Sequence, residues 1–159
     1  MEKIKAANCP FCNSSIDQAI FAESENFLAI YNIAPILPGH SLIIPRWHVQ
    51  SLMDLSDPEL GEMMVFARNT VRLLLKTFGV KAFNWTIQEG EEAGQTVPHL
   101  HVHLIPREPN DLPQPGDWYP LLRQSESEII DSESRSRLTP DEMQKIVMKI
   151  RETAKTMGG

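Results

Sequence analysis

Three histidines alternate with apolar residues in segment 99–105, which reads His-Leu-His-Val-His-Leu-Ile. A period of two is typical of a half-buried strand, on which His99, His101 and His103 would share one face. Neighbouring side chains on that face are about 6.6 Å apart, because each residue of a strand rises ~3.3 Å. Adjacent rings would then be too distant to bond one another but well spaced to contact different parts of one substrate. The segment therefore predicts a pocket lined by histidines.

A single metal ion bound by all three histidines fits this pattern less well. Two histidines of a His-x-His pair can reach one ion, but the third would lie about 13 Å from the first, far beyond a metal–nitrogen bond of ~2.1 Å. A purification tag is excluded because the run is internal and interleaved with aliphatic residues. Nucleophilic attack on phosphorus fits better, because neutral imidazole is well populated at neutral pH. His101, with a histidine on either side, is the best-placed nucleophile.

The same segment resembles the signature of the histidine triad family, His-φ-His-φ-His-φ-φ with φ apolar. The preceding residues 88–97 and the closing Pro106-Arg107 look like the fragile-histidine-triad branch, the dinucleoside polyphosphate hydrolases. Segment 32–40, Asn-x-x-Pro-x-x-Pro-Gly-His, is similar to the part of that branch that forms the nucleotide pocket. The resemblance extends over roughly residues 20–123.

This resemblance implies a hydrolase that cleaves dinucleoside polyphosphates, such as diadenosine tri- or tetraphosphate, and releases a nucleoside monophosphate. The second histidine of the family's triad is the nucleophile, so the implied intermediate is a nucleotidyl group on His101. Two alternatives remain open: a nucleoside phosphoramidate hydrolase, which would use the same His101, and a nucleotide-binding sensor with slow hydrolysis. A nucleotide or dinucleoside polyphosphate is the expected ligand, and no organic cofactor is expected.

The resemblance also gives roles to six further side chains. They are His103 on the attacked phosphoryl group, Gln95 on the phosphoryl or leaving oxygens, Gln88 on the nucleotide, Asn32 on ribose hydroxyls, Leu42 on the base and His40 in support of the histidine rings. The residues alone allow simpler interpretations, because an Asn in a turn often caps its own backbone and a strand Leu is often ordinary core. Arg107 either contacts a phosphate or ends a strand in solvent. Tyr119 either matches a tyrosine of the branch or packs within its loop.

The only two cysteines form a Cys-x-x-Cys pair, Cys9-Pro10-Phe11-Cys12. Such a pair supplies half of a tetrahedral zinc site, and His48 and His99 are candidates for the other half. A redox dithiol is the rival, but that motif normally follows a strand, and nothing strand-like precedes Cys9. Free thiols are a further alternative. Some histidine triad relatives hold a structural zinc, and Cys9, Cys12, His48 and His99 match that set; animal members of the branch lack the cysteines.

Composition indicates one compact domain. The chain has 159 residues, of which 42% are hydrophobic and 23% charged, enough for one core but short for two domains. Its net charge of −6 argues against a nucleic-acid duplex as partner, although Arg46 and Arg107 could make a nucleotide pocket locally positive. No apolar run approaches the ~18 residues of a membrane span. Residues 1–5 lead into Cys9 without a secretory apolar segment, so a cytoplasmic location is expected.

Local patterns divide the single predicted domain (1–159) into four parts. These are a metal-binding arm (1–15), a core with the triad (20–107), an irregular and partly mobile segment (112–138) and a C-terminal helix (139–157).

Apolar runs predict strands at 27–31, 41–45 and 80–88, in addition to the triad strand. Ser56-Asp57-Pro58-Glu59 is a capping box that starts a helix ending before Gly79, and Thr139 begins the second main helix in the same way. The chain is therefore assigned to the α+β class. The family resemblance implies a five-stranded antiparallel sheet that assembles into a homodimer.

Overall fold

The expected five-stranded antiparallel sheet with two main helices is confirmed. The computed structural model describes residues 3–127 and 137–158. Its strands are β1 (Ile20–Glu23), β2 (Phe27–Tyr31), β3 (Ser41–Pro45), β4 (Ala82–Thr86) and β5 (Val102–Arg107), in the order β1-β2-β3-β5-β4 with every pair antiparallel. Its α-helices are α1 (Asp57–Phe78), α2 (Trp118–Ser127) and α3 (Pro140–Met157).

The centre of the sheet is buried on both faces. Every residue of β2 and β3 is buried, which agrees with their nearly continuous apolar sequences. β5 pairs with β3 on one side and with β4 on the other, so that Leu42 lies directly opposite His103. Side chains of directly opposed residues share a face, and Leu42 and His103 are therefore neighbours on the same side of the sheet.

The triad strand starts later than the alternating pattern predicts. β5 begins at Val102, so His99 and His101 precede its first residue and only His103 lies within the strand. His99 is therefore not held to the strict alternation of a paired strand. Its position in the chain just before β5 leaves its side chain able to turn toward the N-terminal arm.

The two main helices begin at the predicted caps. Glu59 accepts hydrogen bonds from the backbone N–H and the hydroxyl of Ser56, and the helix ends at Phe78, before Gly79, whose φ of 70° suits glycine. Thr139 and Glu142 form the corresponding capping box of α3. The buried side of α1 faces the sheet and α3, whereas Met64 of the same helix is 48% exposed.

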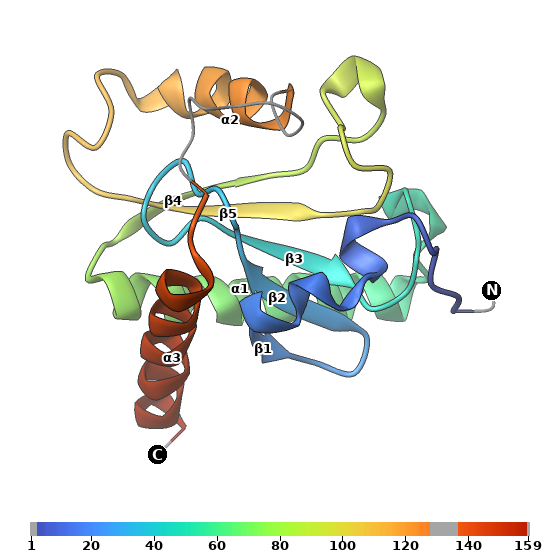
Figure 1. Cartoon of the computed structure of the whole chain (residues 1–159), viewed down its shortest axis with the longest axis horizontal. Helices are drawn as coiled ribbons and strands as arrows, with labels where there is room; N and C mark the ends of the chain where they lie inside the picture. Colours follow the sequence, from blue (N-terminus) through green and yellow to red (C-terminus); the bar gives the residue numbers. More distant parts are fainter. Residues whose placement is uncertain (1–2, 128–136, 159) are drawn as a thin grey trace.

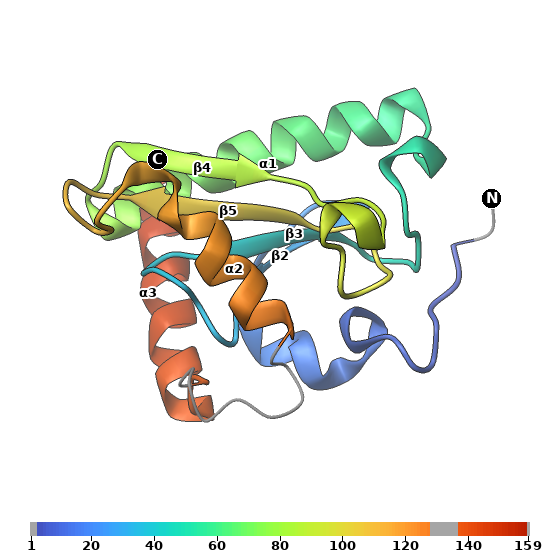
Figure 2. The ribbon, with the colours of Figure 1, turned by 90° about the horizontal axis from the view of Figure 1, so that it is seen from above.

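Figure 1 shows α1 and α2 on opposite sides of the sheet, with α3 crossing near the β1 edge. The view from above, in Figure 2, places α2 across the strands. The prediction of an irregular segment over 112–138 is wrong for Trp118–Ser127, which is helical. Pro120 lies in the first turn of this helix, where a missing N–H is tolerated. Residues 128–136, part of the segment expected to be irregular and partly mobile, lie outside the described part of the chain.

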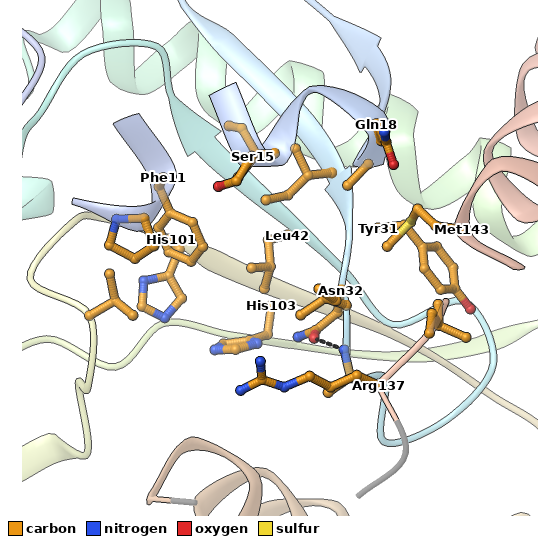
Figure 3. Close-up of a pocket in the computed structure, with 18 of the residues that line it drawn as sticks. Phe11, Ser15, Gln18, Tyr31, Asn32, Leu42, His101, His103, Arg137 and Met143 are labelled. Atoms are coloured by element: carbon orange, nitrogen blue, oxygen red, sulfur yellow. Dashed lines mark hydrogen bonds between the residues drawn. The ribbon is translucent and has the colours of Figure 1, made fainter. Parts of the chain in front are cut away.

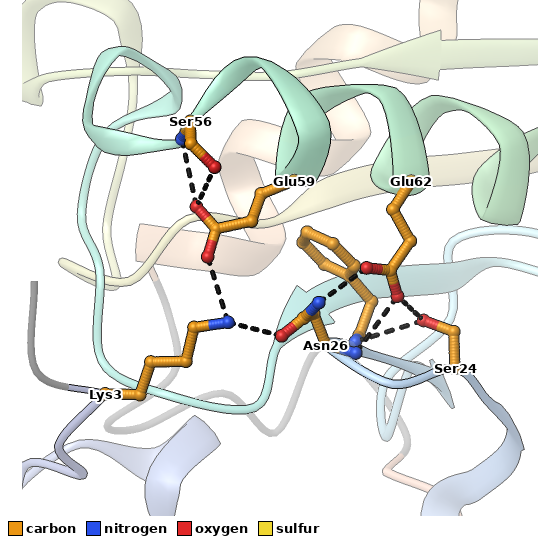
Figure 4. A network of polar contacts seen from close by, with 7 residues as sticks. Lys3, Ser24, Asn26, Ser56, Glu59 and Glu62 are labelled. Atoms are coloured by element: carbon orange, nitrogen blue, oxygen red, sulfur yellow. Dashed lines mark hydrogen bonds and ion pairs between the residues drawn. The ribbon is translucent and has the colours of Figure 1, made fainter.

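The N-terminal arm is attached to the core along its length. The backbone N–H of His48 donates to the carbonyl of Ile4 at 2.7 Å, and Lys3 pairs with Glu59 at 2.9 Å. Figure 4 shows how Lys3 also reaches Asn26, whose side chain binds Glu62 of α1. The arm then forms two short 3-10 turns, Pro10–Cys12 and Ser14–Ala19. No helix within residues 3–127 and 137–158 is long and apolar enough to cross a membrane.

Candidate active site and metal centre

A cavity of about 520 Å³ opens between the N-terminal arm, the sheet and the start of α3. Its volume lies in the range of small-molecule sites, and most of its wall is apolar. Figure 3 shows two triad members, His101 and His103, at one end of it. Several segments that are distant in sequence contribute to the wall, among them Phe11, Ile16, Tyr31, Asn32, Leu42, Val97, Leu122, Arg137 and Met143.

The ring of His101 is held in one tautomer. Its Nδ1 lies 2.7 Å from the carbonyl oxygen of His99, and a carbonyl can only accept, so Nδ1 carries the proton. In the neutral ring Nε2 then carries a lone pair. The side chain is only 3% exposed, yet it lines the cavity. The neutral ring of His101 therefore has its unprotonated nitrogen at Nε2, the form that a nucleophile requires.

His103 is oriented by His40. The N–H of Ile36 donates to Nδ1 of His40 at 3.3 Å, so the proton of neutral His40 is on Nε2. That nitrogen lies 3.0 Å from Nδ1 of His103, which must accept, and His103 therefore carries its proton on Nε2. The tight turn at Gly39, where φ is 90° and a Cβ would come within 2.7 Å of Pro106, sets the direction of His40. His103 thus becomes a hydrogen-bond donor on the cavity wall.

The expected nucleotide contacts divide into two groups. Asn32 and Leu42 line the cavity, although Asn32 Oδ1 also accepts from the N–H of Ala34 at 2.9 Å, the turn-capping contact. Gln95 and Gln88 are not among the lining residues. Gln95 accepts from the N–H of Gly90 and donates to the carbonyl of Gln50, and it therefore holds its own loop. Gln88 is buried beside Thr86, and its Oε1 has no hydrogen-bond partner among the described residues.

The arginines expected near the pocket are engaged elsewhere. Arg107 makes a two-pronged ion pair with Asp111 and also donates to Asn84, so the suggestion of a phosphate contact is wrong for this structure. This pair raises the pKa of Arg107 and lowers that of Asp111. Arg46 donates to the carbonyl of Ser24 and pairs with Glu23.

Arg137 is a charged cavity residue that sequence reasoning missed. Among the described residues that line the cavity it is the only arginine or lysine. Figure 3 shows its side chain directed toward the histidine end of the cavity. The sequence does not indicate that Arg137 lines a cavity, because this residue ends a stretch in which serines alternate with charged residues. Such a composition predicts no fixed position for a side chain.

Cys9, Cys12, His48 and His99 form a candidate metal centre, with their ligand atoms all within 4.8 Å of one another. Sulfur–nitrogen distances are 3.3 Å from Cys9 to His99, 3.6 Å from Cys12 to His99 and 3.8 Å from Cys12 to His48. A tetrahedral zinc ion with bonds of about 2.3 Å to sulfur and about 2.1 Å to nitrogen requires separations of roughly 3.5 Å. The four donors therefore fit zinc, and both cysteines are free thiols in the structure.

The protonation of these groups suits a cation. Nε2 of His99 lies 3.2 Å from the carbonyl of Pro45, so that nitrogen holds the proton and Nδ1 faces the sulfurs with a lone pair. Burial lowers the pKa of His99 to about 4, so the ring is neutral at pH 7. Burial also raises the pKa of the Cys9 thiol, a cost that a bound divalent cation offsets by stabilising the thiolate.

Comparison with protein families gives a direct match: residues 13–110 fit the model of the HIT domain. The chain belongs to the HIT domain family. It is 37% identical over 119 residues to the asymmetrical bis(5'-nucleosyl)-tetraphosphatase of Schizosaccharomyces pombe. The aligned region covers 75% of this chain and 65% of that protein. It is 39% identical over 98 residues to the bis(5'-adenosyl)-triphosphatase of Saccharomyces cerevisiae. The aligned region covers 61% of this chain and 48% of that protein.

A similar HIT fold is found in a Zn-bound histidine triad family protein from Mycobacterium smegmatis. It has a TM-score of 0.68 and 24% identity, and the match covers 95% of this chain and 96% of that one. This likeness establishes the fold. The chain spans about half to two thirds of the length of the two yeast relatives.

Proposed function

We propose that this HIT domain chain is an enzyme that hydrolyses dinucleoside polyphosphates of the diadenosine tri- or tetraphosphate type. The observation that carries the proposal is the fixed tautomer of His101. This residue lines the cavity and has its lone pair on Nε2. The names of the two yeast relatives support the substrate class. A largely apolar cavity with a few polar groups at one end suits a nucleoside joined to phosphates.

In the proposed reaction, Nε2 of His101 attacks the phosphorus next to the bound nucleoside. The bond from that phosphorus to its bridging oxygen breaks, and the remaining nucleotide leaves with the bond's electron pair on that oxygen. Water then attacks the phosphorus of the nucleotidyl-histidine, loses a proton and returns His101 with release of a nucleoside monophosphate. The Nε2 proton of His103 stabilises negative charge on the phosphoryl oxygens. No organic cofactor takes part.

The surrounding side chains have supporting roles in this proposal. His40 holds the tautomer of His103, Asn32 binds ribose hydroxyls, and Leu42 packs on the base beside His103. Gln95 and Gln88 act after a change in their loop, because in the structure their amides are not on the cavity wall. For Gln88, the buried Oε1 without a partner among the described residues makes such a contact with ligand favourable.

We further propose that the metal centre binds zinc and that this zinc is structural. Four protein ligands leave no open position for water, so Cys9, Cys12, His48 and His99 would anchor the arm and not activate a nucleophile. A cytoplasmic location is consistent with two reduced thiols, which a zinc site requires. We also propose a homodimer, because β4 is an edge strand whose Phe83 is 44% exposed.

A substrate panel tests the proposal. Diadenosine tri- and tetraphosphate and adenosine 5'-phosphoramidate are each assayed for binding and for steady-state turnover. Faster turnover of the polyphosphates supports the proposed function, whereas preference for the phosphoramidate identifies a phosphoramidate hydrolase. Tight binding of a polyphosphate, with each turnover taking longer than hours, identifies a sensor. Trapping a nucleotide bound to His101 by rapid acid quench and mass spectrometry tests the covalent step.

A further inference from the structure

Phe11 lies between the two cysteines of the metal centre and also on the wall of the cavity. Its ring centroid is 5.6 Å from that of His99, with an interplanar angle of 87°, and 5.4 Å from that of His101, with an angle of 65°. Both are edge-to-face contacts of the favoured kind. Figure 3 shows the ring of Phe11 directly beside His101. One side chain thus contacts a metal ligand and the nucleophile together.

The ring of His101 is restrained from three directions. Phe11 packs on one side, and the ring of His103 lies on another with a centroid distance of 4.9 Å and an angle of 75°. The carbonyl of His99 holds Nδ1. Rotation of His101 about its side-chain bonds would break the hydrogen bond or collide with one of the two rings. These contacts therefore fix the direction of the attacking nitrogen.

The position of Phe11 depends on its neighbours. The 3-10 turn Pro10–Cys12 is closed by the N–H of Cys12 donating to the carbonyl of Cys9 at 3.1 Å. A metal bound by both sulfurs would restrain both ends of this turn, and so the residue between them.

We propose that Phe11 is a positioning residue that fixes the orientation of His101 and makes that orientation depend on metal binding at Cys9 and Cys12. The inference rests on the proposed role of His101 as nucleophile. The metal then affects turnover without contacting substrate, through the ring of Phe11 and through the His99 carbonyl. Small displacements of a reacting group lower rates by factors up to about 10², so loss of one restraint is expected to cost about tenfold in kcat.

Phe11→Ala and Phe11→Tyr test the side chain in the metal-loaded enzyme. Phe11→Ala is expected to lower kcat about tenfold with a smaller change in KM, because the restraint acts on the reacting nitrogen. Phe11→Tyr keeps the ring and is expected to keep kcat within about twofold. Ile4→Ala is the control, since Ile4 is on the same arm with a side chain 58% exposed. Zinc content by elemental analysis shows whether any loss of activity is loss of metal.

A second readout observes His101 directly. Long-range ¹H–¹⁵N spectra of the histidine rings are expected to show one Nδ1-protonated form of His101 in the wild type and in Phe11→Tyr. Phe11→Ala and metal-depleted protein are expected to show exchange broadening or a mixture of tautomers. These spectra can be measured without turnover. If no substrate of the panel is hydrolysed, the proposed function is rejected, but the spectra still test whether Phe11 orients His101.

A double-mutant cycle tests the link to the metal. Metal removal is expected to lower kcat about tenfold in the wild type and by a clearly smaller factor in Phe11→Ala, because residues that act together are not additive. Equal factors in both proteins, or an unchanged His101 spectrum in Phe11→Ala, would overturn the inference. If Phe11→Ala fails to fold, Phe11→Leu replaces it, and full kcat with an unchanged spectrum in that variant also overturns the proposal.

Discussion

The carbonyl oxygen of His99 accepts a hydrogen bond from Nδ1 of His101 at 2.7 Å, while the ring of His99 faces Cys9 at 3.3 Å. The main chain of His99 therefore orients the candidate nucleophile, while its side chain belongs to the metal centre. Because the main chain is retained in any substitution, His99→Ala is expected to remove metal first and to affect His101 through the resulting displacement of the backbone.

Replacing His101 by Asn is expected to abolish turnover while leaving the fold and nucleotide binding intact. Asn can still donate a hydrogen bond to the carbonyl of His99, but it supplies no nucleophilic nitrogen. We expect kcat to fall by at least about 10³-fold and the dissociation constant for a non-hydrolysable analogue to change less than about fivefold. Stopped assays and calorimetry measure the two quantities. Near wild-type kcat in His101→Asn would exclude the assignment.

The local chemistry of the site could be predicted from sequence where a short motif carries it. Cys-x-x-Cys spacing predicted half of a zinc site with His48 and His99 as candidate partners, and the resemblance to zinc-bearing histidine triad relatives completed this set, which the structure brings together. The period-two pattern predicted the strand itself. It did not predict that the strand begins at Val102, because the start of a ladder depends on where the partner strand pairs.

The contacts that sequence could not predict are tertiary. Gln95 follows a polar loop and precedes the triad, yet its amide binds Gly90 and Gln50, and only the folded loop brings these groups together. Arg107 and Asp111 are four residues apart, but their ion pair removes the arginine from any phosphate. Arg137 reaches the cavity because α3 packs on α1 and β1, a docking that its serine-rich surroundings do not indicate.

Removing the metal ligands is expected to reduce stability before activity. Cys9→Ser and His48→Ala each lose one of four ligands, so zinc content should fall from one per chain, and the melting temperature should drop by about 5 °C or more. Activity per folded molecule should fall less than in His101→Asn. Lys5→Ala, at an exposed residue of the same arm, serves as a control outside the ligand set. Absence of metal from wild-type protein purified without chelator, with both thiols titratable in the folded state, would refute the zinc site.

Arg137 is expected to bind the phosphate chain. Because it is the only arginine or lysine among the described lining residues, Arg137→Ala should lower kcat/KM for diadenosine tetraphosphate about tenfold or more, the effect of losing one hydrogen bond to a charged group. The salt dependence of KM should weaken, and the effect on a phosphoramidate, which has a single phosphorus, should be smaller. Arg123→Ala is the matched control, since Arg123 is exposed on α2 and outside the lining. Equal losses in both variants would contradict this role.

The chain is expected to form a homodimer through the β4 edge. β4 is an edge strand, and Phe83 on that edge and Val65 on α1 are 44% and 49% exposed, so an unpaired edge with apolar side chains is available to a second chain. Light scattering at micromolar concentration should give twice the 18.0 kDa of one chain. Phe83→Glu should shift the mass toward one chain, whereas Met148→Glu, on the exposed side of α3, should not. A wild-type mass of one chain would reject the dimer.

The contacts of Glu59 predict how stability depends on pH. Its hydrogen bond to Lys3, followed by those to Ser56, lowers the pKa of Glu59 to about 2 from 4.5. A carboxyl with a depressed folded pKa stabilises the protein fully above its unfolded pKa, and this contribution is lost as pH falls from about 5 to about 2. Glu59→Gln should therefore destabilise by about 1 kcal/mol at pH 7, the usual cost of a helix-cap contact, and progressively less toward pH 2.5 in urea titrations. Glu152→Gln, which removes an exposed ion pair with Lys155, should show little effect at either pH. An equal destabilisation by Glu59→Gln at pH 7 and pH 2.5 would exclude this linkage.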